Sequence, residues 1–362
     1  MKFRFNQNLL NIRRARAGSS ERMTSPDLFL DRNERVVPYS FDILSELGEH
    51  LAKCRPNQYP ELGLLYERVA DWSALDADQL FITDGVSGAI KALLESLAPA
   101  GTNIVFPSPT FALYPIYAQM FGVEPRIFGY SENYEIDLDA LRKNIDINTA
   151  FVFLPNPNVP IEGYLTLKKI DSIATYCAHF NAALVIDEVY YLFGGETAIR
   201  LIEKHKNLFI MRSFSKGFGL PGVRIGFVAG PAKIIEFVAR TRTGYETSTL
   251  AAETVCFFLD RIDIINEYIK EVKVGLHFLK NSLDNINIPH NGGITGNFVY
   301  IELGDPDLAQ SIIKTLGGQN IRIRGGWPAP FHGGITVTGA PREYMNRFFQ
   351  NFKSALITFK RM

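Results

Sequence analysis

Residues 208–230 read LFIMRSFSKGFGLPGVRIGFVAG and hold two short apolar runs on either side of a polar, glycine-rich turn. The runs, Leu208–Met211 and Ile225–Ala229, have the length and composition of buried β-strands. The polar residues of interest around the turn are Ser213, Ser215, Lys216 and Arg224. The stretch therefore predicts two strands whose neighbouring ends present an amine, two hydroxyls and a guanidinium.

These side chains suit a ligand that carries both an aldehyde and a phosphate. Burial lowers the pKa of a lysine, and a neutral amine such as that of Lys216 can condense with an aldehyde. Arginine offers a planar fork of donors to a phosphate, so Arg224 and the two serines can hold one. Pyridoxal 5′-phosphate (PLP) needs this combination. The alternative is an exposed loop lysine beside a structural arginine.

Residues 217–222, GFGLPG, also fit the dinucleotide pattern G-x-G-x-x-G. That pattern requires a helix to begin within it, but Pro221 stands where the helix would be running and a strand resumes at Ile225. A dehydrogenase is therefore disfavoured, and failure to bind NAD(H) would exclude it.

The rest of the chain alternates between strand-like and helix-like segments. Strands are predicted at 81–83, 104–106, 151–154 and 183–186, with helices at 89–97 and 167–180 between them. The run Ala183–Ile186 lacks polar alternation, so it is predicted to be buried on both faces. This order predicts an α/β fold with a mostly parallel sheet, whose ligand lies beyond the carboxyl ends of the strands.

The bulk composition excludes several classes of function. The 362 residues have a formal net charge of zero, which gives no reason to expect nucleic acid or a membrane surface as a partner. Three scattered cysteines predict neither a disulfide framework nor a metal site, and fit a reducing compartment. Residues 1–16 lack the apolar core of a signal peptide, and no run is long enough to span a membrane. We expect a cytoplasmic protein without a metal.

Several polar side chains follow the predicted strands and could surround the cofactor. Asp187 could face the pyridinium nitrogen and keep it protonated, and Tyr190 could bond the phenolic oxygen. Tyr114 could stack on the ring. The helix that follows Gly85 offers backbone N–H groups to the phosphate, and Ser87 could add its hydroxyl.

The chain resembles the class I and II aminotransferases of PLP fold type I, in particular their histidinol-phosphate aminotransferase branch, which also includes threonine-phosphate decarboxylases. The segments that carry the resemblance are residues 30–34, 58–61, 85–90, 109–114, 187–190 and 213–226. The resemblance implies that Lys216 forms the Schiff base and that Gly85, Val86 and Ser87 help to bind the phosphate. It also implies a homodimer with shared active sites, in which Tyr59 reaches the phosphate of the neighbouring subunit.

Two positions depart from the family pattern. In the stretch 156–163, NPNVPIEG, Val159 replaces an asparagine that bonds the cofactor, and Asn156 or Asn158 could substitute for it. In the small domain the family uses two arginines for the substrate anion. Arg324 matches the first, with Asn33 also implied in substrate binding, whereas Gly334 replaces the second. Arg322, His332 or Arg32 could rebuild the second contact. Arg322 and Arg324 alternate on a predicted strand, so only one of them can face the site.

The expected organisation is an N-terminal arm (residues 1–45) that packs with the small domain, a large PLP-binding domain (46–258) and a small C-terminal domain (259–362). The predicted function is an aminotransferase acting on a small phosphorylated or otherwise anionic amine, with small-molecule amine and keto substrates. The alternatives are a PLP decarboxylase of a phosphorylated amino acid and a non-catalytic protein that keeps the fold.

Overall fold

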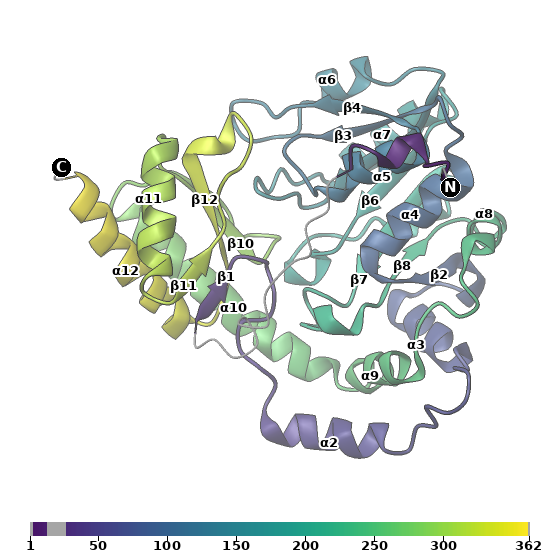
Figure 1. Cartoon of the computed structure of the whole chain (residues 1–362), viewed down its shortest axis with the longest axis horizontal. Helices are drawn as coiled ribbons and strands as arrows, with labels where there is room; N and C mark the ends of the chain where they lie inside the picture. Colours follow the sequence, from purple (N-terminus) through teal and green to yellow (C-terminus); the bar gives the residue numbers. More distant parts are fainter. Residues whose placement is uncertain (1–2, 13–26, 361–362) are drawn as a thin grey trace.

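The computed structural model describes residues 3–12 and 27–360. A seven-stranded sheet forms its centre, in the order β2-β8-β7-β6-β5-β3-β4 (Figure 1). Its strands are β2 (Leu80–Thr83), β3 (Asn103–Pro107), β4 (Glu124–Phe128), β5 (Thr149–Pro155), β6 (Ala183–Asp187), β7 (Leu208–Ser213) and β8 (Gly226–Ala229). Only β8 runs antiparallel to its neighbours β2 and β7. The mostly parallel sheet and the α/β class are confirmed.

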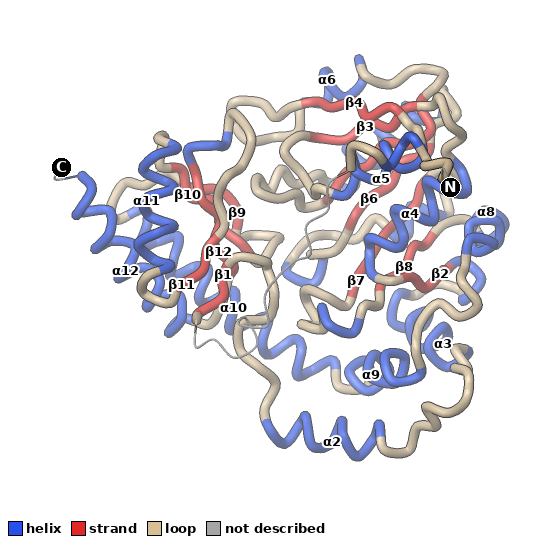
Figure 2. Tube along the Cα trace, viewed as in Figure 1, coloured by secondary structure: helices blue, strands red, loops and turns tan. Residues whose placement is uncertain are grey.

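Helices cover both faces of this sheet (Figure 2). The helices of this part are α2 (Phe41–Leu51), α3 (Gly63–Ser73), α4 (Gly85–Leu97), α5 (Leu113–Phe121), α6 (Leu138–Lys143), α7 (Leu167–Ala178), α8 (Ala232–Val238) and α9 (Thr249–Leu259). One apolar core joins the sheet to α4, α5 and α8, and a second joins its other face to α3, α7 and α9. Alternate strand residues enter the two cores: Val185 lies in the first and Ile186 in the second. Burial on both faces explains the unbroken apolar runs of these strands.

A smaller α+β unit follows (left in Figure 1). Its helices are α10 (Ile262–Asp284), α11 (Pro306–Gly317) and α12 (Arg342–Lys360), and its strands are β9 (His290–Gly292), β10 (Phe298–Glu302), β11 (Ile321–Ile323) and β12 (Gly334–Thr338). From the N-terminal region, β1 (Leu28–Leu30) pairs in parallel with β11. This pairing fixes the start of the segment 31–33, which lies over the site described below.

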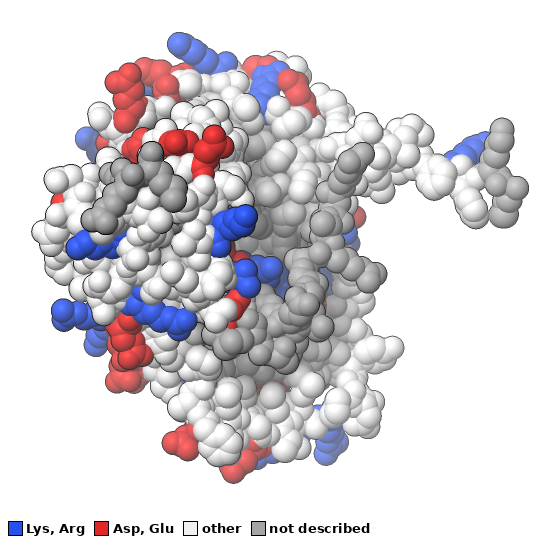
Figure 3. Space-filling model, turned by 60° about the vertical axis from the view of Figure 1, so that its left-hand side comes forward, with Lys and Arg blue, Asp and Glu red and all other residues white. Residues whose placement is uncertain are grey.

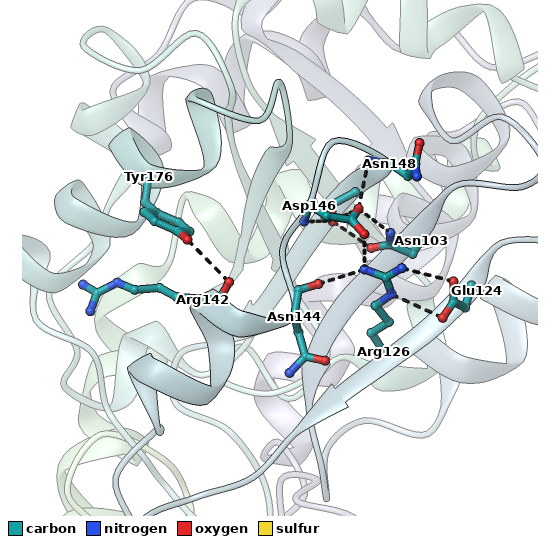
Figure 4. A network of polar contacts seen from close by, with 9 residues as sticks. Asn103, Glu124, Arg126, Arg142, Asn144, Asp146, Asn148 and Tyr176 are labelled. Carbon is teal, nitrogen blue, oxygen red and sulfur yellow. Dashed lines mark hydrogen bonds and ion pairs between the residues drawn. The ribbon is translucent and has the colours of Figure 1, made fainter.

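The polar network drawn in Figure 4 lies at the amino ends of the parallel strands. Arg126 donates to Asp146 Oδ2 at 2.6 Å and to Glu124 Oε1 at 3.2 Å. Asn103, the first residue of β3, donates to Asp146 Oδ1 at 3.1 Å. Because this network lies at the end of the sheet opposite to the carboxyl ends of the strands, its charges are not part of the predicted site.

The start of one helix differs from the sequence-based expectation, and several elements were not predicted. Helix α4 begins at Gly85, four residues before the predicted start, so Gly85, Val86 and Ser87 form its first turn. Strand β4 and helix α11 were not predicted. The proposed domain boundaries stay a prediction, and part of the segment 1–16 lies outside the described residues. Among the described helices, none is long and apolar enough to cross a membrane.

Candidate active site

A cavity of about 440 Å³ opens at the carboxyl ends of the central strands. The predicted site residues that line it are Asn33, Gly85, Val86, Ser87, Asn158, Asp187, Tyr190, Ser213, Ser215, Lys216, Arg224 and Arg324. Figure 3 shows basic and acidic side chains together in a hollow between two lobes of the surface. The geometry thus brings most of the predicted residues to one place, and leaves out Tyr114, Asn156 and Tyr59.

One end of the cavity is built from the start of α4 and the start of β8. Gly226 pairs with both Thr83 and Ser213, so Arg224, two residues earlier, lies beside the first turn of α4. Its Nη2 donates to Ser87 Oγ at 3.3 Å. Gly85 has a φ of +61°, a backbone conformation that favours glycine, and a Cβ there would lie 2.9 Å from that nitrogen.

Two serines complete this end of the cavity. Ser213 Oγ donates to Ser215 Oγ at 2.9 Å, and the Ser215 backbone N–H donates to Ser213 Oγ at 3.1 Å. Hydroxyls, a guanidinium and the amino end of a helix are donors that bind a phosphate.

Lys216 follows β7 and is half-buried at the centre of the cavity. Its Nζ donates to the backbone oxygen of Arg32 at 2.6 Å. Burial lowers the pKa of Lys216 to about 8, with Arg324, Arg224 and Arg32 adding to this and Glu34 opposing it. The neutral amine, which is the nucleophilic form, is therefore present in roughly a tenth of the molecules at pH 7, far more than for a lysine in water.

Asp187, the last residue of β6, lies at the buried end of the cavity. Its carboxylate accepts the Tyr114 hydroxyl at 2.9 Å and the Val189 N–H at 3.2 Å. Burial raises the pKa of Asp187 to about 6, and none of the described cationic side chains forms an ion pair with it. Its neighbour Glu188 is also buried but pairs with Arg212 at 3.0 Å.

The geometry does not favour the expected stacking of Tyr114 on the cofactor ring. The Tyr114 ring has no exposed surface, lies behind Asp187 and does not line the cavity. Phe111, three residues earlier, lines the cavity and contacts Tyr114 edge-on at 5.9 Å. Phe111 lies in the loop between β3 and α5 and Tyr114 in the first turn of α5, and the sequence could not show which ring faces the cavity.

The asparagines of the loop after β5 do not replace the missing amide at Val159. Asn156 uses both ends of its amide on the backbone of Leu165, at 2.8 and 3.0 Å, and does not line the cavity. Asn158 lines the cavity, but its Nδ2 donates to the Pro109 oxygen at 3.0 Å and also to the Tyr130 hydroxyl. The suggested substitution by Asn156 or Asn158 is therefore not supported by the geometry.

Tyr190, in the loop after β6, lines the cavity. Its oxygen accepts a hydrogen bond from Asn33 Nδ2 at 2.8 Å, and burial raises its pKa to about 12. Asn33 itself is 8% exposed. The pair joins the N-terminal segment to the loop after β6.

Arg324 lines the cavity from the small unit. Its guanidinium lies over the Trp327 ring at 4.2 Å, and Trp327, which the sequence analysis did not single out, lines the cavity as well. Arg322 points elsewhere and pairs with Asp27, as the alternation on a strand predicted.

Gly334 cannot be replaced by arginine without a rearrangement. A Cβ at Gly334 would lie 2.2 Å from the Tyr300 hydroxyl oxygen. Tyr300 is 2% exposed and packs edge-on to Phe331 at 5.8 Å, so its ring has no room to withdraw. The small unit therefore presents Arg324 to the cavity, and position 334 cannot hold a second arginine unless Tyr300 moves.

Tyr59 lies outside the cavity. Its side chain is 77% exposed and stacks on Tyr245 with ring centroids 4.7 Å apart.

These features together fit PLP. A buried carboxylate without a described cationic partner suits the pyridinium nitrogen, and the donors at the other end suit the phosphate. The amine of Lys216 lies in the same cavity, where it can reach the aldehyde.

The model of the family "Aminotransferase class I and II" matches residues 44–348. The chain belongs to this family, and it is a PLP-dependent transaminase that acts on small-molecule amine and keto substrates. Two relatives are histidinol-phosphate aminotransferase 1 of Bacillus cereus, 29% identical over 82% of this chain and 80% of the relative, and histidinol-phosphate aminotransferase 2 of Dechloromonas aromatica, 30% identical over 82% and 83%.

Solved structures show the same fold. A histidinol-phosphate aminotransferase from Sinorhizobium meliloti, in complex with pyridoxal-5′-phosphate, superposes with a TM-score of 0.88 at 18% identity and covers 99% of both chains. An aspartate aminotransferase from Thermus thermophilus gives a TM-score of 0.80 at 15% identity, with 98% of this chain covered and 100% of the other. These likenesses confirm fold type I.

Proposed function

We propose that this aminotransferase acts on a small amine or amino acid with an anionic group, of the kind that histidinol phosphate represents. The observation that carries the proposal is the cavity itself, in which Lys216 and Asp187 lie deep and Arg324 stands at the small-unit wall. The names of the relatives agree with this class of substrate.

Bound PLP supplies an electrophilic carbon for the amine and a ring that withdraws electrons from the substrate carbon. Asp187 would hold the ring nitrogen in its protonated form, since the attraction of opposite charges at about 4 Å amounts to roughly 4 kcal/mol at an effective dielectric constant of 20. Phe111 would cover one face of the ring. Ser213, Ser215, Arg224 and the first turn of α4 would hold the phosphate.

Lys216 would hold the cofactor covalently and then, once the substrate amine has displaced it, carry a proton between two carbon atoms. Its lowered pKa supports both roles, because a neutral amine is needed for attack and for accepting a proton. Tyr190 would donate to the phenolic oxygen of the cofactor. Arg324, ordered by Trp327, would bind the anionic group of the substrate.

A second candidate is a decarboxylase of a phosphorylated amino acid. The observation that favours it is the position of Tyr300 against Gly334, which leaves one small-unit arginine at the cavity where the family resemblance implies two. A carboxylate that is not firmly neutralised is easier to lose as carbon dioxide.

A spectral screen of the PLP-loaded protein tests the proposal. Histidinol phosphate, aspartate, glutamate and phosphothreonine are added one at a time, and the conversion of the cofactor spectrum to its amine form is followed together with carbon dioxide release. We expect conversion with an anionic amine and no carbon dioxide. Carbon dioxide without a keto or aldehyde product would favour the decarboxylase, and no response to any anionic amine would contradict the proposal.

We also propose that the protein is a cytoplasmic homodimer in which Tyr59 contacts the cofactor phosphate of the other subunit. Helix α2 buries none of its residues, and Phe41 and Leu44 on it are 83% and 47% exposed. The exposed Tyr59–Tyr245 pair is a further apolar surface. Cys54, Cys177 and Cys256 are free thiols, as expected in a reducing compartment. Sedimentation of the holoenzyme as a monomer would contradict the dimer.

A further inference from the structure

Asn33 uses every polar group it has. Its backbone N–H donates to Thr338 Oγ1 at 2.9 Å and its backbone oxygen accepts from Asn297 Nδ2 at 3.2 Å. Its side-chain Oδ1 accepts from the Thr338 hydroxyl at 3.1 Å, and its Nδ2 donates to the Tyr190 hydroxyl at 2.8 Å. Three of these four contacts go to the small unit and one goes to the active-site tyrosine.

The hydrogen atoms of this chain of contacts can be placed by counting. Thr338 has no exposed surface and its oxygen accepts the Asn33 N–H, so its single hydrogen goes to Asn33 Oδ1. The other end of the amide, Nδ2, therefore faces Tyr190 as a donor. Because the Tyr190 oxygen accepts this bond, its own hydrogen remains free to point elsewhere.

The hydroxyl hydrogen of Tyr190 is free to point into the cavity. Tyr190 lines the cavity, and the charges of Asp187 and Arg324 both act on its pKa, in opposite directions. The hydroxyl thus shares the cavity wall with Asp187 and Arg324 and is within electrostatic reach of both. The Asn33 amide is nearly buried, and a contact holds each of its ends: Thr338 at Oδ1 and Tyr190 at Nδ2.

We propose that Asn33 is a positioning residue, not a substrate ligand: it turns the Tyr190 proton toward the ring oxygen of the cofactor, and it makes this orientation depend on β12 being in place. The inference rests on the proposed role of Tyr190 as donor to that oxygen. A left-handed backbone explains the residue type, because Asn33 has a φ of +54° and asparagine adopts this conformation more readily than most residues.

The consequence can be observed in the absorption of the cofactor. With Val159 in place of a second donor, Tyr190 is the donor that stabilises the negative ring oxygen when the nitrogen bound to Lys216 loses its proton. Removing the donor makes that nitrogen hold its proton more tightly, so the pH at the midpoint of the spectral titration rises. A hydrogen bond to a charged group corresponds to a shift of about one pH unit or more.

The test is a titration of the PLP-loaded protein, without substrate, in four forms: unchanged, Tyr190→Phe, Asn33→Asp and the double variant. Asn33→Asp keeps the shape and the contact with Thr338 but replaces the donor by an acceptor, which forces Tyr190 to turn its proton away from the cavity. We expect Tyr190→Phe and Asn33→Asp each to raise the midpoint by about one pH unit or more, and the double variant to match Tyr190→Phe.

Two further variants separate positioning from stability. Asn33→Gly tolerates the left-handed backbone and leaves the Tyr190 hydroxyl free to rotate, so we expect a smaller rise. Thr338→Val removes the hydroxyl that fixes the amide, and we expect a rise in the same direction although residue 338 does not reach the cofactor. A purely structural role of Asn33 predicts a lower melting temperature in these variants with an unchanged midpoint, and would overturn the proposal.

The remaining outcomes are equally decisive. An unchanged midpoint in Asn33→Asp beside a raised one in Tyr190→Phe would show that the direction of the Tyr190 proton does not depend on Asn33, and the inference would be wrong. An equal further rise when Asn33→Asp is added to Tyr190→Phe would show that the new charge acts directly. If Tyr190→Phe itself shifts nothing, the proposed role of Tyr190 fails, and the inference fails with it.

Discussion

Two carboxylates at opposite edges of the same sheet have opposite environments. At the amino ends, Asp146 is 42% exposed and receives Arg126 at 2.6 Å, which lowers its pKa to about 2. At the carboxyl ends, Asp187 is 3% exposed and burial raises its pKa to about 6. Asp146 thus has a cationic partner within the protein, Arg126. We infer that Asp187 receives its cation from the cofactor.

A closer comparison excludes burial alone as the reason. Glu188 is as buried as Asp187 and adjacent to it in sequence, yet it accepts two hydrogen bonds from Arg212, at 3.1 and 3.0 Å. The fold can therefore supply a buried carboxylate with an arginine at this depth. It does so for the residue that faces away from the cavity and not for the residue that faces into it.

The largest effect is expected at Lys216. Lys216→Ala removes the amine that binds the cofactor and moves the proton, so transamination should fall by at least about 10³-fold. Stopped-flow measurement of the half-reaction checks this. Lys216→Arg keeps a charge but cannot form the bond, and activity retained in that variant would contradict the assignment.

Glu188→Gln tests the carboxylate that already has its cation. It leaves Arg212 buried without a negative partner, which should cost about 3–5 kcal/mol of folding free energy. Urea unfolding at fixed protein concentration measures the loss. The fraction that stays folded should bind PLP with unchanged affinity, and a large loss of affinity would weaken the contrast with Asp187.

Asp187→Asn should have the reverse effect: a loss of PLP affinity without a large loss of stability. The amide keeps its contact with Tyr114 but loses the attraction for a pyridinium nitrogen, so PLP affinity should fall by roughly 10²-fold, within the ~4 kcal/mol of the charge pair. Fluorescence titration of the apoprotein with PLP measures it. Unchanged affinity would show that Asp187 does not face the ring nitrogen.

The stability of the apoprotein should depend on pH in opposite directions through Asp187 and Asp146. The folded pKa of Asp187 lies above its ordinary value of 3.8, so its ionisation opposes folding and stability should fall, by up to about 3 kcal/mol, as pH rises from about 4 to 6. Asp187→Asn should abolish this slope. A slope that persists in the variant would assign it to another group.

The smallest effect is expected at Asp146. Its folded pKa lies below 3.8, so its contribution is complete above that pH and is lost as pH falls toward about 2. Because the pair is exposed, Asp146→Asn should cost less than about 1 kcal/mol near neutral pH. Cofactor binding should not change, and a change would mean that the two edges are coupled.

Much of the sheet could be predicted because its strands are buried on both faces. Segments such as Ala183–Ile186 read as continuous apolar runs, and the polar residues that follow them predicted a site at the carboxyl ends, where the cavity lies. Strand β4 escaped prediction because it lies at the edge of the sheet and keeps Glu124 and Pro125 exposed. Helix α11 has a start that the sequence shows, with Asp305 as its cap and Pro306 in its first turn.

The site was predictable in its residues and less so in their contacts. The sequence singled out Tyr114 and gave no sign that Phe111, in the loop before α5, is the ring that lines the cavity. It associated Asn33 with the substrate, whereas its bond to Tyr190 depends on residues far apart in the chain. Likewise, the contact between Gly334 and Tyr300 arises from the pairing of β10 with β12.

The most direct test of the central claim is reduction of the PLP-loaded protein with borohydride, followed by peptide mapping, in the unchanged protein and in Asp187→Asn at a PLP concentration that half-saturates the former. We predict a stable label on Lys216 alone, with much lower occupancy in the variant. A label on another lysine, or equal occupancy in both proteins, would contradict the account.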